Sequence, residues 1–160
     1  MLNYLKIKFK NFNNKKCLLI VGFIYVYYFF LSLNHIHIVM SLNNEYTYPL
    51  MVSITSILLN SNKNSFIHFH ILIGNDVEKN NINKITSLKK LNINCSFNYY
   101  NVGETFKGWR HGKPKITVAA FYRMISGELI KDVNKIIYLD GDTIIYSDLY
   151  EMYNLNIYAI

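Results

Sequence analysis

The sequence predicts an α/β domain built on a mostly parallel, twisted sheet. From residue 34 onward, short runs rich in β-branched and aromatic residues alternate with helical stretches, which is typical of parallel strands joined by right-handed crossovers. The chain has 160 residues, of which 51% are hydrophobic and 16% aromatic, so it can form one domain with a substantial core.

The first elements follow from apolar runs and from the turn residues between them. A strand is expected over Ile36–Leu42, because the apolar run there ends at two consecutive asparagines. Tyr48–Leu59 is expected to be helical, and a second strand is expected over Phe66–Ile73, closed by the turn residues 74–76. One face of the predicted helix carries Leu50, Ile54, Ile57 and Leu58.

The next elements begin with a helix that Asn75 or Asp76 is expected to cap. A third strand is expected over Ile93–Tyr100. It is followed by a loop at 101–114, rich in glycine, lysine and aromatic residues, and by a helix over Ile116–Ile130. The capped helix carries an apolar stripe formed by Ile82, Ile85, Leu88 and Leu91.

The most informative motif, Asp140-Gly141-Asp142, follows the last predicted strand, Lys135–Leu139. Side chains at i and i+2 of an extended segment point the same way, so both carboxylates can converge on one cation. The glycine between them allows a tight turn and the close approach of a ligand. Paired oxygen ligands suit Mg²⁺ or Mn²⁺, which usually also bind substrate phosphates, and ligands of parallel α/β sheets bind at the carboxyl ends of strands. We therefore expect a metal–diphosphate site here.

Other interpretations of this motif imply different chemistry. A solvated turn is disfavoured, because apolar strands flank the motif and no Lys or Arg lies between Asp140 and Ile160. An EF-hand loop from Asp140 to Glu151 is rejected, since Ile145 occupies the position that requires glycine. An aspartyl phosphatase, with Asp140 as nucleophile and Asp142 as acid/base, stays open as the alternative chemistry.

Positive charge is concentrated at the N-terminus. The formal net charge is +7, but five lysines lie within the first sixteen residues, and the rest of the chain is close to neutral. A nucleic-acid-binding domain would carry its basic residues across the folded part, so we expect no nucleic-acid partner. The two cysteines, Cys17 and Cys95, form neither a disulfide framework nor a zinc motif.

An uncharged apolar segment at 17–33 follows the basic stretch. Its length is about the lower limit for crossing a bilayer, and the lysines before it predict a cytoplasmic N-terminus. We expect a basic cytoplasmic tail at 1–16, a type II signal-anchor and transmembrane helix at 17–33, and a domain at 36–160 on the lumenal side of the secretory pathway, as in the Golgi. A cleaved signal peptide, which would release a secreted domain, and a buried helix are the alternatives.

Three segments together resemble a known family. They are Ile38–Tyr46, Phe121–Ile130, which contains a Tyr-Arg pair, and Ile136–Asp142, which contains the Asp-x-Asp motif. In this order and spacing they resemble glycosyltransferase family 8, the retaining galactosyl- and glucosyltransferases related to bacterial lipopolysaccharide galactosyltransferases and glycogenin. The resemblance covers residues 36–160. It implies a Rossmann-like GT-A nucleotide-sugar domain that transfers a hexose from a UDP-sugar with retention and uses Mn²⁺ (or Mg²⁺).

The resemblance implies roles for five residues. Asp140 and Asp142 would be the metal ligands, with Asp140 also close to the ribose of the donor. Arg123 would contact the donor sugar or neutralise phosphate, for which its planar fork of donors is suited. Tyr46 would stack on uracil, and Asn43, where the family usually has Asp, would line the base pocket. These motifs do not specify the acceptor, which could be a glycan, a lipid or a protein.

The resemblance is to the N-terminal half of the family. Its members continue beyond the Asp-x-Asp strand into an acceptor-binding half with a His-x-x-Gly-x-x-Lys motif, which has no match in this sequence. We therefore expect the chain to be an incomplete and inactive portion of a transferase, or a non-catalytic nucleotide-sugar-binding relic. The pairs His35/His37 and His68/His70 have metal-ligand spacing, but no carboxylate cluster accompanies them, and we expect ordinary strand residues.

Overall fold

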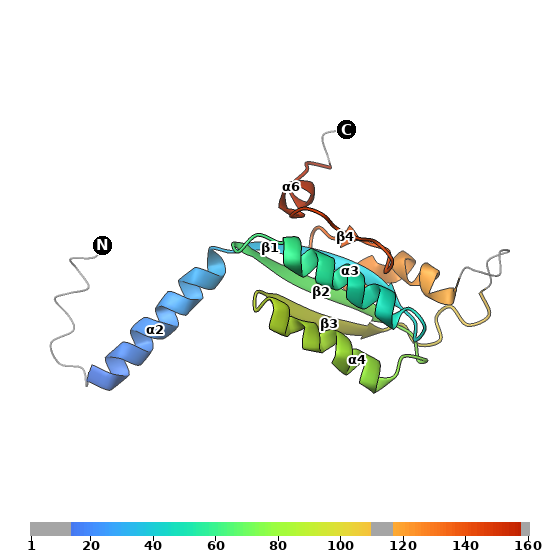
Figure 1. The fold of residues 1–160 in the computed structure, drawn as a ribbon, viewed down its shortest axis with the longest axis horizontal. Coiled ribbons are helices and arrows are strands. Elements are labelled where there is room, and N and C mark those ends of the chain that lie inside the picture. Colours follow the sequence, from blue (N-terminus) through green and yellow to red (C-terminus); the bar gives the residue numbers. More distant parts are fainter. Residues whose placement is uncertain (1–13, 110–116, 158–160) are drawn as a thin grey trace. The chain divides into compact units, whose positions relative to one another are not determined.

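The computed structural model describes residues 14–109 and 117–157 of the chain (Figure 1). The chain divides into two compact units, Met1–Leu33 and Asn34–Ile160. The described element of the first unit is the helix α2, Asn14–Leu31. The described elements of the second unit are, in chain order, β1 (Asn34–Leu42), α3 (Thr47–Asn60), β2 (Ser65–Ile73), α4 (Lys79–Thr86), η1 (Ser87–Leu91), β3 (Cys95–Asn101), η2 (Val118–Ile125), α5 (Ser126–Leu129), β4 (Ile137–Tyr138) and α6 (Tyr150–Tyr153).

Within its described part, the second unit is built on a four-stranded sheet in which every neighbouring pair is parallel. The strand order is β3-β2-β1-β4, so the chain moves outward from β1 in one direction and then returns to add β4 on the other side. β1 and β2 pair along their whole length, from Asn34 opposite Ser65 to Leu42 opposite Ile73. This arrangement confirms the predicted parallel α/β fold.

Alternation along the strands fills one face of the sheet with apolar side chains. Ile36 and Ile38 of β1 are fully buried, as is Phe69 of β2, whose ring stacks on Phe97 of β3 with centroids 5.0 Å apart. The helices α3 and α4 cover this face (Figure 1). They contribute the buried residues Leu50, Ile54, Ile57 and Ile85. Burying one such side chain contributes about 1.5–3 kcal/mol relative to leaving it exposed, so this layer is the main source of stability.

On the opposite face of the sheet, apolar side chains lie at one end of the strands and histidines lie at the other. Toward the carboxyl ends of the strands, Val39 and Leu72 belong to a second core cluster, which η2 covers. The other buried members of this cluster are Val102, Phe106, Ala119, Tyr122 and Ile130. Toward the amino ends of β1 and β2, the same face carries His35, His37, His68 and His70, which we call the histidine array.

The helix predicted after the second strand starts late and is not capped as expected. α4 begins at Lys79, and no side chain caps it. Asp76 instead accepts a hydrogen bond from the backbone N–H of Asn44 at 2.8 Å, and the Asn75 amide donates to Glu104 at 3.1 Å. Both predicted caps are therefore engaged in contacts between loops, which the local sequence does not reveal.

The helix predicted over Ile116–Ile130 is largely a 3₁₀ helix. Residue 116 lies outside the described residues, η2 spans Val118–Ile125, and the short α5 follows at Ser126–Leu129. The buried residues Ala119 and Tyr122 are three positions apart, which suits three residues per turn as well as 3.6. The apolar spacing therefore predicted a helix but not its type.

The segment predicted to cross a membrane does form a helix, α2. It contains Tyr25, Tyr27 and Tyr28, which lower its apolar character. Among the described residues, no helix is both long and apolar enough to cross a bilayer. The predicted cytoplasmic tail at 1–16 lies mostly outside the described residues.

Candidate functional site

The strand order creates a position where polar residues from distant parts of the chain converge. Connections leave the middle of the sheet in opposite directions, so that β2 lies on one side of β1 and β4 on the other. In open α/β sheets, ligands bind at the carboxyl ends of strands where the order reverses in this way. β4 is shorter than predicted and pairs with Ile38 and Val39, which places the Asp-Gly-Asp turn beside the end of β1.

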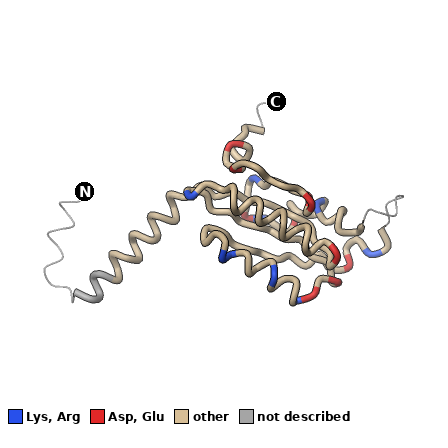
Figure 2. Tube along the Cα trace, in the orientation of Figure 1, with Lys and Arg blue, Asp and Glu red and all other residues tan. Residues whose placement is uncertain are grey.

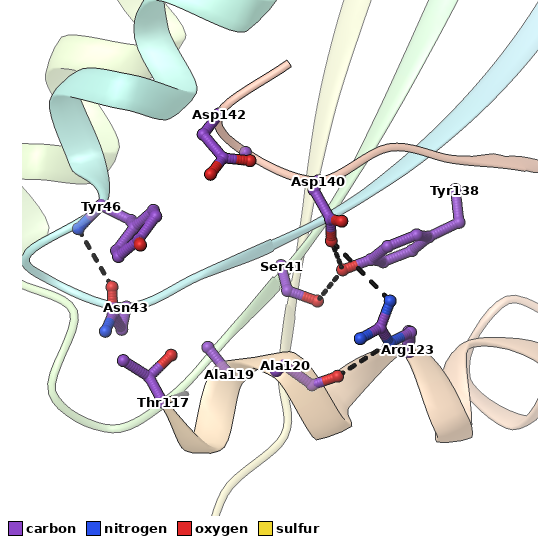
Figure 3. Close-up of a pocket in the computed structure, with 11 residues that line it drawn as sticks. Ser41, Asn43, Tyr46, Thr117, Ala119, Ala120, Arg123, Tyr138, Asp140 and Asp142 are labelled. Carbon is purple, nitrogen blue, oxygen red and sulfur yellow. Dashed lines mark hydrogen bonds and ion pairs between the residues drawn. The ribbon is translucent and has the colours of Figure 1, made fainter. Parts of the chain in front are cut away.

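A pocket of about 270 Å³ lies at this reversal (Figure 3). It is lined by the end of β1 and the turn that follows, by the start of η2, and by the residues around the end of β4. The lining residues are Ser41, Asn43, Tyr46, Thr117, Ala119, Ala120, Arg123, Tyr138, Asp140, Gly141 and Asp142. The five residues for which the sequence predicts a role in donor or metal binding are therefore in one pocket.

Asp140 is held by two neighbours on one carboxylate oxygen. The Tyr138 hydroxyl donates to Asp140 Oδ1 at 3.0 Å, and Arg123 Nη1 lies 3.8 Å from the same oxygen (Figure 3). Ser41 Oγ lies 3.4 Å from the Tyr138 hydroxyl oxygen. Burial raises the pKa of Tyr138 above its ordinary value, so the phenol stays protonated and able to donate. One edge of the Asp140 carboxylate is thus fixed.

Arg123 reaches this network from η2. Its Nε donates to the Ala120 carbonyl at 3.0 Å, and the carbon at the centre of its guanidinium group lies 5.3 Å from the centroid of the Tyr138 ring. The Arg123 side chain is 50% exposed, so its ion pair with Asp140 contributes little to stability. The positive charge is therefore available to an anionic ligand in the pocket.

The turn after β4 presents the second carboxylate, that of Asp142. Thr143 closes this turn by donating its backbone N–H, at 3.2 Å, and its hydroxyl, at 2.8 Å, to the Asp140 carbonyl oxygen. A Cβ added at Gly141 would lie 3.4 Å from Leu50 Cδ1, which is close to an ordinary van der Waals contact, and φ at Gly141 is not positive. Glycine is therefore less strictly required in this turn than the sequence suggests.

Asn43 and Tyr46 form the other end of the pocket. The backbone N–H of Tyr46 donates to Asn43 Oδ1 at 3.0 Å and to the Asn43 carbonyl at 3.2 Å, so the Asn43 side chain shapes the turn that leads into α3. Because Oδ1 is engaged, the side-chain N–H₂ group of Asn43 is left to donate to a ligand. Tyr46 is 37% exposed, and its ring borders the pocket (Figure 3).

The donor set of the pocket fits a divalent cation that also binds phosphate. Among the described residues, no group of three or more His, Cys, Asp or Glu is arranged to hold a metal. Two carboxylates still suffice for Mg²⁺ or Mn²⁺, because substrate phosphates and water usually complete the coordination of these ions. Acidic residues lie in several loops at the carboxyl ends of the strands, with some basic residues among them (Figure 2).

The histidine array lies outside this pocket and is bonded within itself. His35 Nδ1 lies 2.9 Å from His68 Nε2, and His37 Nδ1 lies 3.0 Å from His70 Nε2. The rings of His37 and His68 stack with centroids 4.3 Å apart. The four side chains therefore join β1 to β2 on the face opposite the main core.

Sequence reasoning missed Ser41 and Tyr138. Each lies two residues before a predicted site residue, Asn43 and Asp140 respectively, and residues at i and i+2 of a strand share a face. This spacing places each of them on the same face as a predicted site residue, but it does not show that their side chains line a pocket. Thr117 lines the pocket without any such indication in the sequence.

The parallel α/β sheet matches the fold of GT-A glycosyltransferases over about 76% of the chain, and sequence comparison identifies the family. Residues 37–159 match the family described as glycosyl transferase family 8. A Haemophilus influenzae protein named "Putative glycosyltransferase" is 33% identical over 124 residues, which make up 76% of this chain and 36% of that protein. The chain therefore belongs to glycosyltransferase family 8, as its motifs predict.

Solved structures agree on the fold. The galactosyltransferase LgtC, in complex with donor and acceptor sugar analogs, matches with a TM-score of 0.65 and 24% identity, covering 76% of this chain and 43% of LgtC. The apo structure of the bifunctional glycosyltransferase WbbM matches with a TM-score of 0.65 and 22% identity, covering 77% of this chain and 21% of WbbM. The chain spans about a third of the length of the curated relative that it matches.

Proposed function

We propose that this chain binds a UDP-sugar and belongs to a metal-dependent hexosyltransferase that retains the configuration of the transferred sugar. The observation that carries the proposal is the composition of the pocket at the strand reversal. It combines two carboxylates, a half-exposed arginine and a partly exposed tyrosine ring. These groups suit, respectively, a divalent cation, a diphosphate and an aromatic base.

The pocket has one end for a base and another for phosphates. At the first end, Tyr46 offers an aromatic face, and stacking of a base on such a face is worth about 1–3 kcal/mol. Asn43 there offers an amide donor to the edge of the base. At the second end, Arg123 offers a planar fork of N–H donors that matches phosphate oxygens.

The two carboxylates complete the phosphate end. Asp140 and Asp142 would hold Mn²⁺ or Mg²⁺, which as a Lewis acid would offset negative charge on the departing diphosphate. Neighbouring side chains restrict both carboxylates at the phosphate end of the pocket. Tyr138 and Arg123 contact Asp140 Oδ1, and Thr143 closes the turn that contains Asp142. Arg123 also adds positive charge beside the leaving group.

Membership of family 8 supports glycosyl transfer over the aspartyl phosphatase chemistry that an Asp-x-Asp motif alone leaves open. LgtC is a galactosyltransferase whose structure holds donor and acceptor sugar analogs, which supports a hexosyl donor here. With Mn²⁺ or Mg²⁺ present, hydrolysis of phosphomonoesters by this chain would favour the phosphatase chemistry, whereas binding of UDP-sugars without such hydrolysis would favour the transferase.

Calorimetry with UDP tests the proposal directly. Wild-type affinity should rise when Mn²⁺ is added, and Asp142→Asn should lose this rise, because a site with two protein ligands cannot spare a charged one. Asp132→Asn, the same change at an exposed carboxylate outside the pocket, should behave like the wild type. A wild type that binds no UDP would contradict donor binding, and an Asp142→Asn variant with unchanged Mn²⁺ dependence would contradict the metal assignment.

A further inference from the structure

The Tyr138 hydroxyl is held firmly at the edge of the pocket. Tyr138 in β4 pairs with Val39 in β1. The next residue, Leu139, donates its backbone N–H to the Val39 carbonyl at 3.0 Å. The Tyr138 ring is partly buried against the second core cluster. Backbone and ring are thus both anchored, and the hydroxyl lies 3.0 Å from Asp140 Oδ1 (Figure 3).

Asp140 needs such an anchor, because it lies beyond the end of the strand. Its side chain is 60% exposed, and an exposed carboxylate on a turn populates several rotamers unless hydrogen bonds restrict it. The ion pair with Arg123 is long at 3.8 Å, and exposed pairs of this kind define a geometry poorly. The shorter hydrogen bond from Tyr138 is therefore the contact that fixes Oδ1.

We propose that Tyr138 is a positioning residue of the metal site, whose hydroxyl holds Oδ1 of Asp140 and so restricts the carboxylate that would bind the divalent cation. This inference rests on the proposed function, since it needs Asp140 to bind an ion. Removing the hydrogen-bond partner of a metal-ligating side chain typically weakens metal binding by about 10- to 100-fold. Because Asp140 is largely exposed, we expect the lower end of this range, about tenfold.

Tyr138→Phe isolates the hydroxyl, because the ring that remains keeps its place in the cluster and beside Arg123. The probe is Mn²⁺ alone, with the free ion measured by electron paramagnetic resonance as the full chain is added. Tyr138→Phe should bind Mn²⁺ about tenfold more weakly than the wild type. Its thermal unfolding midpoint should change little, because the ring keeps its packing against the second core cluster. The matched control is Tyr146→Phe, which removes a hydroxyl from a residue that is 85% exposed outside the pocket.

A double-mutant cycle shows whether Tyr138 acts through Asp140. In an Asp140→Asn background, titrated to higher Mn²⁺ concentrations, Tyr138→Phe should cause no further loss, because the carboxylate it orients is gone. Additive losses, or a Tyr138→Phe affinity within about twofold of the wild type, would overturn the positioning role and leave the proposed function intact. If the wild type itself binds no Mn²⁺, the metal-dependent function fails and the positioning role fails with it.

Discussion

Acidification should destabilise the second unit through the histidine array. In the array, His35 pairs with His68 and His37 pairs with His70, with ring nitrogens 2.9 and 3.0 Å apart. Each of these hydrogen bonds needs a proton on one nitrogen and a free lone pair on the other. The rings of His37 and His68 also stack at 4.3 Å, so protonating several rings would place like charges against one another.

The size of the effect follows from the shifted pKa values. Burial in the first place, and neighbouring histidines in the second, lower the pKa of His68 and of His70 from 6.5 to about 4. Between these values the unfolded chain binds more protons than the folded chain, so the free energy of unfolding is highest above pH 6.5 and falls as the pH approaches 4. Each full shift corresponds to about 3 kcal/mol. The buried His70 can therefore contribute about 3 kcal/mol, whereas the partly exposed His68 contributes less because solvent screens it.

The other groups that face the array do not change the sign of this effect. On β3, Ser96 Oγ lies 3.0 Å from His68 Nδ1, and the Tyr100 hydroxyl lies 2.9 Å from His70 Nδ1. The ring of Tyr153 from α6 also faces the array. All three side chains are neutral between about pH 7 and pH 4, so none of them offsets the added positive charge.

Urea unfolding, followed by circular dichroism at a series of pH values, measures the effect. The wild type should lose a large part of this free energy of unfolding above about pH 5, before most carboxylates titrate. The double variant His68→Gln/His70→Gln lacks both rings of low pKa and should show a flatter profile. A wild-type profile that is flat between about pH 6.5 and pH 5, or a double variant as acid-sensitive as the wild type, would refute the reasoning.

Further predictions concern one glycine and the two ends of the pocket. Gly74→Ala should lower the free energy of unfolding by about 1–3 kcal/mol, because its Cβ would collide with the Tyr122 hydroxyl. Gly127→Ala, whose Cβ would meet nothing within 4 Å, is the control in the same urea titration, and equal stability of the two variants would contradict the collision. Tyr46→Leu should weaken uridine and UDP alike by about fivefold, since both would lose the stacked base. Arg123→Gln should weaken UDP by about tenfold and spare uridine; equal losses for both ligands in calorimetry would exclude a phosphate contact.

The strands β1 and β2 could be predicted from the sequence, whereas the extent of β4 could not. β1 and β2 are apolar runs with a period of two. Each predicted strand begins one or two residues after the observed strand and ends at the same residue. The predicted strand Lys135–Leu139 is observed only as Ile137–Tyr138, because a strand extends only as far as its partner pairs with it. Pairing is a property of two segments, and a single run of residues does not encode it.

The same reason separates the site residues that could be predicted from those that could not. Asp140 and Asp142 stand out in the sequence, because paired acids after an apolar strand are unusual. Tyr138 and Ser41 resemble ordinary strand residues, and their hydroxyl oxygens come within 3.4 Å only because β4 pairs with β1. These two residues are 97 positions apart, so no local pattern could indicate their contact.

The residues of the main core, which stabilise the fold, are largely distinct from the residues that line the pocket. The main core lies between the sheet and the helices α3 and α4, whereas the pocket lies at the strand ends, where η2 and the turn after β4 meet. Arg123 and Asp140 are at least half exposed, so their polar contacts contribute little to folding. Substitutions of these exposed groups should therefore change ligand binding with little effect on the free energy of unfolding. This separation is what allows a loss of affinity in the pocket variants to be interpreted as a loss of contact with the ligand.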